Sequence, residues 1–225
     1  MKVRVGFTPA EEVAAPVGIV IDVLRATSTI CQALASGYER VVCVAEVEDA
    51  RALAGEGVAL AGERHNVLIE GFDFGNSPRE VAEKPDVDTL ILSTTNGTSA
   101  ILEAAARCDS VVLGALLNLD ALVLMLRESG EDVAILCAGF QGSFALDDAY
   151  CAGRIVHALA AERSDAAIAA DLVAESFPDA WTGLTARTYG PPGLDQDIRF
   201  CAQESVLDVV PRFAGMDGPA AVVTA

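Results

Sequence analysis

Residues 18–31, GIVIDVLRATSTIC, hold an apolar run that ends at Asp22, and Arg25, Thr27 and Ser28 follow within a few positions. A short run rich in Val and Ile is typical of a buried strand, and the residues after it suit a helix. One interpretation is that the strand simply ends and a hydroxyl, Thr27 or Ser28, caps the helix. The other is that the strand delivers an acid and a base to a functional site.

Length and composition predict a single domain, residues 1–225. The 225 residues are 52% apolar, and no Pro/Gly/Ser-rich linker divides them. Many small aliphatic side chains can fill a sizeable core, so a disordered chain is excluded.

The formal net charge of −18 predicts a strongly acidic surface. Such a surface repels nucleic acid and anionic membranes over a Debye length, about 8 to 10 Å. We therefore expect no nucleic-acid partner and no membrane partner. An anionic ligand would have to meet a local group of arginines, backbone N–H groups or a metal ion.

The cysteines stand singly in the sequence, without a C-x-x-C pair, which favours reduced thiols in a cytoplasmic protein. Residues 1–4 lead into a strand-like stretch and not into a signal peptide. No apolar run approaches the roughly 18 residues of a membrane span. The six cysteines are Cys31, Cys43, Cys108, Cys137, Cys151 and Cys201.

Short Val/Ile-rich runs alternate with Ala/Leu/Glu-rich stretches of helical period, which predicts an α/β fold. The expected strands are 2–6, 17–23, 39–45, 57–61, 87–93, 109–113, 132–138 and 220–224. The expected helices are 28–36, 47–54, 78–83, 98–107, 119–129, 146–163, 165–175 and a last one near 195–209. Ser77 to Glu80 form a capping-box pattern, and Gly37 and Gly130 stand where helices are expected to end.

Polar residues follow five of the expected strands. In open α/β sheets ligands bind beyond the carboxyl ends of the strands, where loops and helix N-termini converge. We therefore expect these side chains to share one edge of the sheet. They are Asp22 and Arg25, Glu63 and Arg64, residues 93–98, Asn118, and Asp147 and Asp148.

Asp22 lies in an apolar run, where an unpaired carboxylate would cost several kcal/mol. It therefore needs a partner. An ion pair with Arg25 or a helix cap satisfies that need as well as a catalytic or metal-binding role does.

The stretch Thr94-Thr95-Asn96-Gly97-Thr98 lies between an expected strand and an Ala-rich helix. Asn-Gly tolerates positive φ, so the backbone N–H groups can form a nest for an anion at the helix N-terminus. The stretch lacks the Gly-Lys-Ser/Thr ending of a Walker A loop. It predicts a cradle for phosphate.

Asp147 and Asp148 begin an expected helix, where acids also stabilise the helix dipole. Neighbouring side chains on a helix diverge by about 100°, so only one of the two is expected to face the strand ends. Carboxylate oxygens suit Mg²⁺, and arginines suit a phosphate oxyanion. The residues alone predict a site for a small anionic ligand, which Mg²⁺ could help to bind.

Taken together, the motifs resemble the 2-phosphosulfolactate phosphatase (ComB) family. They are IDVLRATSTI at 21–30, GER at 62–64, GFDFGNSP at 71–78, STTNGT at 93–98, Asn118, CAG at 137–139 with DD at 147–148, and DIRFC at 197–201. They cover nearly the whole chain in order. Family members typically have Glu-Asp where this chain has Asp147-Asp148, a difference that keeps the charge.

The resemblance implies a three-layer α/β/α fold with a mostly parallel or mixed sheet. It implies a Mg²⁺-dependent phosphomonoesterase that converts 2-phosphosulfolactate to sulfolactate and phosphate, a step toward coenzyme M, in a self-associating cytoplasmic enzyme, a homodimer or other homo-oligomer. Another small phosphorylated carboxylic acid is an alternative substrate, and a non-catalytic anion-binding module is an alternative function.

On this basis Asp22, Glu63 and Asp148 are expected to hold Mg²⁺ or its waters, while Arg25 and Arg64 clamp anionic groups. These five residues form the predicted catalytic set. Attack on phosphorus by a metal-activated water is preferred over an aspartyl-phosphate on Asp22. The expected substrate-binding residues are Thr27, Asn76, Ser77, Thr94, Thr95, Asn96, Gly97, Thr98 and Asn118. Arg79, Asp197 and Arg199 are weaker candidates, the last two only if the final helix folds back over the strand ends.

Overall fold

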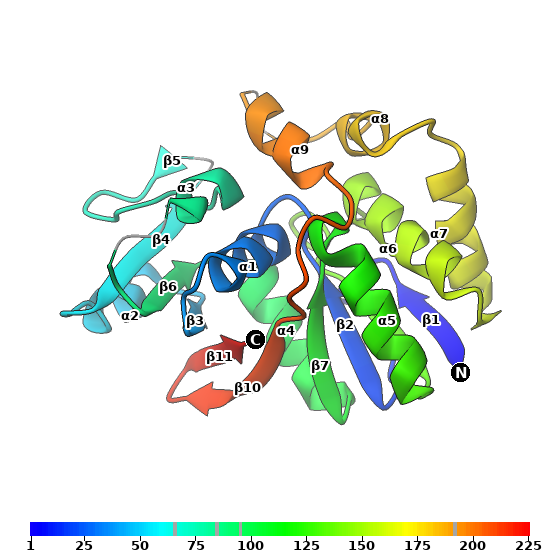
Figure 1. The fold of residues 1–225 in the computed structure, drawn as a ribbon, viewed down its shortest axis with the longest axis horizontal. Coiled ribbons are helices and arrows are strands. Elements are labelled where there is room, and N and C mark those ends of the chain that lie inside the picture. Colours follow the sequence, from blue (N-terminus) through cyan, green and yellow to red (C-terminus); the bar gives the residue numbers. More distant parts are fainter. Residues whose placement is uncertain (65–66, 84–85, 95, 191–192) are drawn as a thin grey trace.

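The computed structural model describes residues 1–64, 67–83, 86–94, 96–190 and 193–225. In this part of the chain one mixed sheet of eleven strands is flanked by helices, so the predicted α/β/α fold is confirmed (Figure 1). The strands are β1 (Lys2–Gly6), β2 (Val17–Ile21), β3 (Arg40–Val44), β4 (Val58–Arg64), β5 (Val67–Leu68), β6 (Thr89–Ser93), β7 (Ser110–Gly114), β8 (Val133–Cys137), β9 (Glu162–Arg163), β10 (Arg212–Asp217) and β11 (Ala220–Thr224).

The strand order is β5-β4-β6-β3-β11-β10-β7-β2-β8-β1-β9. Two parallel blocks, β4-β6-β3 and β7-β2-β8-β1, lie on either side of the antiparallel hairpin β10–β11. The hairpin pairs with β3 through β11 and with β7 through β10. The hairpin therefore joins two parallel blocks whose strands come earlier in the sequence.

Helices connect and cover these blocks. They are α1 (Ala26–Ala35), α2 (Val47–Ala52), α3 (Pro78–Ala82), α4 (Asn96–Arg107), the 3₁₀ turn η1 (Leu116–Asn118), α5 (Leu119–Ser129), α6 (Leu146–Leu159), α7 (Asp165–Glu175), α8 (Ala180–Thr185) and α9 (Asp195–Cys201).

Strand β2 lies in the middle of the core and is buried along its whole length. Because successive side chains of a strand point to opposite faces, Ile19 and Ile21 pack with α5, α6 and α7, whereas Val20 packs in the cluster that contains Ile101 of α4. Helices thus cover both faces of this block, which is why the apolar run of the opening stretch is uninterrupted.

Several elements differ from the prediction. The helix expected at 146–163 ends at Leu159, where Ala160 takes a left-handed conformation with φ of 51°, and the chain continues into β9. The last helix ends at Cys201 and not near 209. Strands β5, β9 and β10 and helix α8 were not predicted, since each is short or contains glycine and lacks a clear period.

Two of the expected helix ends are confirmed and one cap is wrong. Gly130 ends α5 with φ of 66°, and Gly37 follows α1 with φ of 98°, conformations that glycine adopts at low cost. Ser77 precedes α3 but makes no cap with its side chain, and Glu80 accepts a hydrogen bond from the Gly75 N–H at 2.7 Å. The Ser77 hydroxyl instead donates a hydrogen bond to Asp197, at 2.7 Å.

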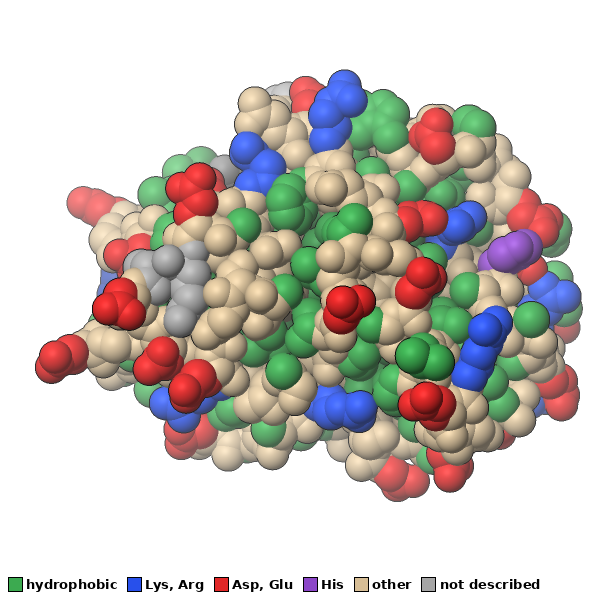
Figure 2. Space-filling model, in the orientation of Figure 1, with side chains coloured by type: hydrophobic (Ala, Val, Ile, Leu, Met, Phe, Trp, Pro, Cys, Tyr) green, Lys and Arg blue, Asp and Glu red, His purple; other side chains and the backbone are tan. Residues whose placement is uncertain are grey.

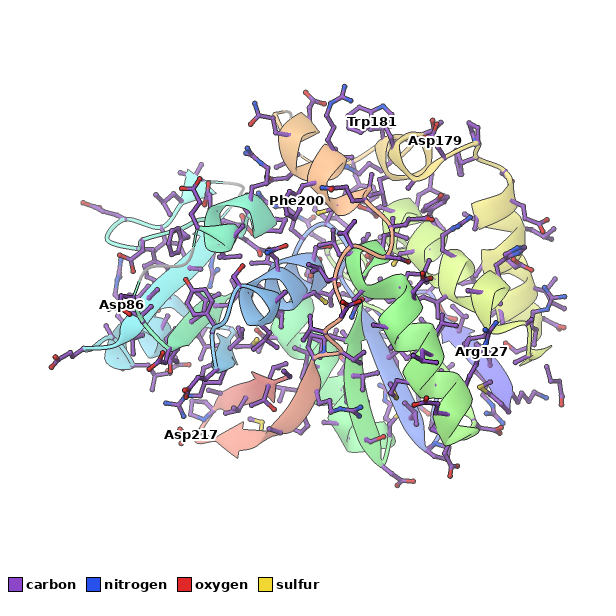
Figure 3. All side chains as sticks on the ribbon, in the orientation of Figure 1. Asp86, Arg127, Asp179, Trp181, Phe200 and Asp217 are labelled. Atoms are coloured by element: carbon purple, nitrogen blue, oxygen red, sulfur yellow. The ribbon has the colours of Figure 1, made fainter. Side chains whose placement is uncertain are left out.

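Helices α8 and α9 lie beyond the ends of the central strands (Figure 1). The Arg199 guanidinium lies 4.1 Å from the centre of the Trp181 ring and joins the two helices. Figure 3 labels Trp181 at the top of the view, between α9 and α8. The final helix therefore does fold back over the strand ends, as a role for Asp197 requires.

Carboxylates are spread over the face of the molecule seen in Figure 2, as the net charge predicts. None of the helices in the described part of the chain is long and apolar enough to cross a membrane.

Candidate active site

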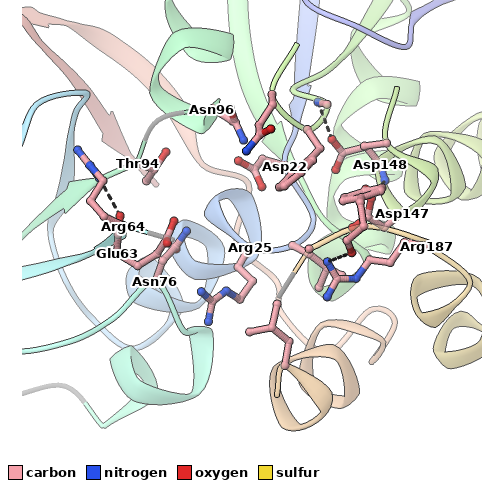
Figure 4. Close-up of a pocket in the computed structure, with 18 residues that line it drawn as sticks. Asp22, Arg25, Glu63, Arg64, Asn76, Thr94, Asn96, Asp147, Asp148 and Arg187 are labelled. Carbon is pink, nitrogen blue, oxygen red and sulfur yellow. Dashed lines mark hydrogen bonds between the residues drawn. The ribbon is translucent and has the colours of Figure 1, made fainter. Parts of the chain in front are cut away.

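A cavity of about 460 Å³ lies at the carboxyl ends of β2, β4, β6 and β8, beside residues 187–190 and 194 of the segment between α8 and α9 (Figure 4). Both the parallel blocks and this segment contribute to its walls. Its charged side chains are Asp22, Arg25, Glu63, Arg64, Asp147, Asp148 and Arg187.

Asp22 follows β2 directly, and its Oδ1 accepts a hydrogen bond from the Ala26 N–H, the first of α1, at 3.3 Å. Burial raises the pKa of Asp22 to about 6. The hydrogen bond from Ala26 lowers this pKa, and the negative charge of the nearby Asp147 raises it further. The acid thus caps α1 and also faces the cavity. A backbone partner and a place at the cavity are thus combined in Asp22, and its catalytic or metal-binding role stays a prediction.

The predicted hydroxyl cap is wrong. Thr27 and Ser28 lie inside α1, and their hydroxyls donate to the backbone oxygens of Asp22 and Val23, at 3.0 and 2.8 Å. Both side chains are fully buried. They secure the turn from β2 into α1 and leave the capping to Asp22.

Asp148 ties the ends of two neighbouring strands together. Its Oδ1 accepts from the Val23 N–H at 2.9 Å, and its Oδ2 accepts from the Gly139 N–H at 3.0 Å. Burial, followed by the charges of Asp147 and Asp22, nevertheless raises its pKa well above the ordinary value. The carboxylate is fixed in place among like charges, an arrangement that favours a cation.

Asp147 also lines the cavity, so the expectation that only one of the two acids faces it is wrong. Its Oδ1 accepts hydrogen bonds from the Tyr189 hydroxyl and from the Asp148 N–H. Burial raises the pKa of Asp147, although the Tyr189 hydrogen bond and the Arg187 charge oppose the rise. The cavity is wide enough to take both carboxylates of the α6 N-terminus.

Arg25 is held from the far side by Asp197 of α9. The Arg25 Nη1 lies 2.6 Å from Asp197 Oδ2, and the side chains are 10% and 6% exposed. Asp197 Oδ1 accepts from the Ser77 hydroxyl at 2.7 Å and from Arg79 Nε at 2.9 Å. Burial alone would raise the pKa of Asp197, but these hydrogen bonds outweigh it and keep the pKa below its ordinary value.

Glu63 and Arg64, at the end of β4, form part of the opposite wall. The Arg64 guanidinium donates to the backbone oxygens of Glu63 and Ala45, at 2.8 and 2.6 Å, and to the Ser93 hydroxyl at 3.0 Å. In Figure 4 it points away from Asp22. Arg64 therefore braces the ends of β4 and β6 while lining the cavity, and its role as a clamp for an anion stays a prediction.

The predicted phosphate cradle lies at the start of α4. Thr94 and Asn96 line the cavity, and Asn96 lies beside Asp22 in Figure 4. A Cβ built on Gly97 would lie 2.5 Å from the Ala26 Cβ and 3.2 Å from Asp22 Oδ2, so a larger residue does not fit there. Thr95 lies outside the described residues.

Asn76 is 6% exposed, and its Oδ1 has no hydrogen-bond partner in the described part of the chain. It lines the cavity beside Glu63 and Arg25. A buried amide oxygen without a donor costs about 1 to 3 kcal/mol, so it favours a ligand that supplies a donor or a cation.

The family model of 2-phosphosulpholactate phosphatase matches residues 5–215 of this sequence. The chain belongs to this family. A relative from Thermus thermophilus is 38% identical and covers 99% of this chain and 98% of its own. Relatives from Symbiobacterium thermophilum and Thermotoga petrophila are 39% and 38% identical over 93% of this chain and 96% and 94% of theirs. Each is named a probable 2-phosphosulfolactate phosphatase, a phosphoric monoester hydrolase.

In this member of the 2-phosphosulpholactate phosphatase family, some predicted substrate-binding residues lie away from the cavity wall. The Asn118 amide donates to the backbone oxygens of Leu113 and Val209 and accepts from the Ala115 N–H. Thr98 donates to the Val44 oxygen. Asn118, Thr98, Ser77 and Thr27 are each bonded inside the protein and are not among the residues that line the cavity, and their predicted role in binding substrate is untested.

Sequence reasoning missed Arg187 and Tyr189, which line the cavity from the segment after α8. This segment follows a stretch without periodic signal, and only its position over the strand ends brings it to the site. Charge and aromaticity in an otherwise Gly/Pro-rich stretch are the sequence signal that could have found them.

Proposed function

We propose that this protein is a Mg²⁺-dependent phosphomonoesterase that hydrolyses 2-phosphosulfolactate to sulfolactate and phosphate. One observation carries the proposal: carboxylates and arginines from both parallel blocks meet in one cavity, in a chain of this family. An anion-binding module gains little from acids beside its anion, whereas a metal-dependent phosphatase needs them.

The phosphoryl group would be held by donors that are fixed before the substrate binds. The Thr94 hydroxyl and the Asn96 amide line one wall of the cavity, where α4 begins. A helix N-terminus favours an anion through its N–H groups and its dipole. Arg25, positioned by Asp197, supplies a positive charge to the same cavity. Preorganised donors of this kind stabilise charge that develops on the transferred group.

The acidic side of the cavity fits Mg²⁺. The raised pKa values of Asp22 and Asp148 indicate buried acids that repel one another, and Asn76 offers an oxygen without a donor. Among the described residues, Asp22, Glu63 and Asp148 do not bring three ligand atoms within 4.8 Å of one another. Mg²⁺ commonly keeps several waters and takes one or two carboxylates, so these acids would hold the ion or its waters. Bound Mg²⁺ would neutralise charge on the phosphoryl oxygens and lower the pKa of a water.

In the proposed reaction a water oxygen attacks phosphorus in line with the C2 oxygen of the substrate. A new P–O bond forms, the bond between phosphorus and the C2 oxygen breaks, and a proton from water ends on the sulfolactate hydroxyl. The steric course at phosphorus, followed with a substrate whose phosphoryl oxygens are isotopically chiral, distinguishes this route from an aspartyl-phosphate. A single in-line attack by water inverts phosphorus, whereas two displacements through Asp22 give net retention, which would overturn it.

The direct test is phosphate release by the purified protein, with and without EDTA. We expect release from 2-phosphosulfolactate that EDTA abolishes and Mg²⁺ restores. Asp22→Asn and Arg25→Ala should each lower kcat/KM by about 10²-fold or more, since each removes charge that acts on the transferred group. Asp120→Asn, an exposed acid in the first turn of α5, is the matched control and should retain full activity.

A panel with 2-phospholactate and the phosphoglycerates tests the substrate. Faster hydrolysis of one of these would make the enzyme a phosphatase for another phosphorylated carboxylic acid. Stabilisation by a phosphoester without turnover of any compound would favour the anion-binding module.

The same proposal places the enzyme in the cytoplasm and its reaction in coenzyme M synthesis. Free thiols at all six cysteines support a reducing compartment. The acidic charge supports the expectation that nucleic acid is not a partner. Self-association stays a prediction, which sedimentation would test.

A further inference from the structure

Three arginines line the cavity, and they differ in how their donors are used. Arg25 donates to Asp197, and Arg64 donates to two backbone oxygens and the Ser93 hydroxyl. Arg187 makes one hydrogen bond in the described part of the chain, from Nη1 to the Tyr189 oxygen at 3.1 Å. A guanidinium carries five N–H donors, so Arg187 keeps most of its capacity for a ligand.

Arg187 is nevertheless held in position. Its guanidinium carbon lies 5.8 Å from the centre of the Tyr189 ring, and that ring stacks on Phe140 with the ring centres 4.6 Å apart. The Tyr189 hydroxyl donates to Asp147. The segment that carries Arg187 is thus fastened to the cavity wall at the α6 N-terminus.

Gly190 makes room for this arrangement. A Cβ at position 190 would lie 2.3 Å from Arg187 Nη1, and the backbone there has φ of 90°, which glycine adopts readily. The guanidinium therefore rests against the backbone of its own segment and remains half-buried at the cavity.

In the view of Figure 4, Arg187 and Asp147 lie on one side of the cavity, and Glu63, Arg64 and Asn76 lie on the other. The Thr94 and Asn96 wall, where phosphate would bind, is separate from Arg187. A ligand that reaches both must carry a second anionic group beyond its phosphate.

We propose that Arg187 forms a subsite for a second oxyanion group of the substrate, a carboxylate or a sulfonate, and so selects phosphoesters that carry one. The inference rests on the proposed phosphatase function and narrows its substrate class. A planar guanidinium pairs with such groups through two parallel N–H···O bonds, and partial burial strengthens them. Elsewhere in the cavity the acids repel that group, so Arg187 decides where it lies.

The test uses phosphoesters of one shape. 2-Phospholactate carries a carboxylate, 1-sulfopropan-2-yl phosphate carries a sulfonate, and isopropyl phosphate carries neither. We expect Arg187→Gln to lower kcat/KM about 10- to 100-fold for one or both of the charged esters, mainly through KM, and less than about threefold for isopropyl phosphate. Which charged ester is affected identifies the oxyanion. Arg51→Gln, on exposed α2, is the control and should leave the three rates unchanged.

Equal losses on all three esters would overturn the subsite, because Arg187 would then act on phosphate or on folding. The absence of any loss would overturn it as well. Gly190→Ala gives an independent check, since its Cβ displaces the guanidinium while the charge stays. It should reproduce the selective loss, and circular dichroism establishes that both variants are folded.

Failure of the proposed function is distinguishable from failure of the subsite. If the parent releases phosphate from no ester, the phosphatase proposal fails. Calorimetry with sulfolactate, which has no phosphate, then tests the subsite alone. We expect at least tenfold weaker binding by Arg187→Gln than by the parent, whereas equal binding, or none by the parent, would overturn the subsite.

Discussion

Replacing Asp22 with Asn should make the metal-free protein more stable at neutral pH while abolishing phosphate release. Asn keeps the shape of the side chain, and its oxygen can still accept from the Ala26 N–H. What the substitution removes is a charge that lies near Asp147 and Glu63. The proposed catalytic role of an acid whose charge destabilises the fold predicts that stability and activity change in opposite directions.

The magnitude follows from the pKa of Asp22. Folding raises that pKa from 3.8 to about 6. At about 1.4 kcal/mol per pH unit, the charged form costs the folded state about 3 kcal/mol. Asp22 is only half-buried and lines the cavity, so solvent screening reduces this cost, and we expect a gain of about 1 to 2 kcal/mol for Asp22→Asn.

The sign of the pH dependence is also fixed. Because the folded pKa is raised, the protonated acid favours the folded state, and this contribution is complete below about pH 4 and lost as the pH rises through 6. The stability difference between Asp22→Asn and the parent should therefore be small near pH 4 and reach its full value above pH 7.

Urea unfolding in EDTA from pH 5 to pH 8 measures this difference, and Asp120→Asn serves as the control, with no such pH dependence. If Asp22 holds Mg²⁺ as proposed, adding Mg²⁺ should stabilise the parent more than the variant. A variant that is no more stable than the parent at pH 8, or a difference that does not grow with pH, would refute the reasoning.

Three further substitutions separate structure from catalysis. Asn118→Ala should cost about 2 to 3 kcal/mol of stability, measured by urea unfolding, because it leaves buried backbone groups without partners, and kcat/KM should stay within about threefold of the parent. Gly153→Ala places a Cβ 2.0 Å from the Ala170 oxygen between α6 and α7, and should lower the free energy of unfolding by about 3 kcal/mol. Asp197→Asn weakens the pair with Arg25 and should cost about 3 kcal/mol at pH 7. Because that pKa is lowered below 3.8, the cost should shrink only as the pH falls below about 4, which unfolding at about pH 2.5 and at pH 7 would measure.

The residues that gather at the carboxyl ends of the strands could be predicted from the sequence, because two simple rules apply to them. Apolar runs locate the strands, and parallel strands send their carboxyl ends to one side, so Asp22, Glu63, Thr94 and Asp148 were found by position alone. The second acid, Asp147, was misjudged because the angle between neighbouring helix residues says nothing about how wide a cavity is.

Contacts between distant parts of the chain could not be predicted in this way. Ser77 has the sequence of a helix cap, yet its hydroxyl bonds to Asp197, 120 positions away. Arg187 and Tyr189 reach the site only because α8 and α9 lie over the strand ends. Local sequence patterns indicate which structures and contacts a segment can form by itself. In these two cases the packing of distant segments determined which contacts formed.

The hairpin β10–β11, wedged between β3 and β7, has a consequence for the order of folding. During synthesis the block that carries Glu63 and Thr94 and the block that carries Asp22 and Asp148 both leave the ribosome before residues 212–224 exist. Until then the two blocks cannot be joined through hydrogen-bonded strands. Pairing that spans so much sequence is slow to form, so assembly of the cavity is delayed until residues 212–224 have been made.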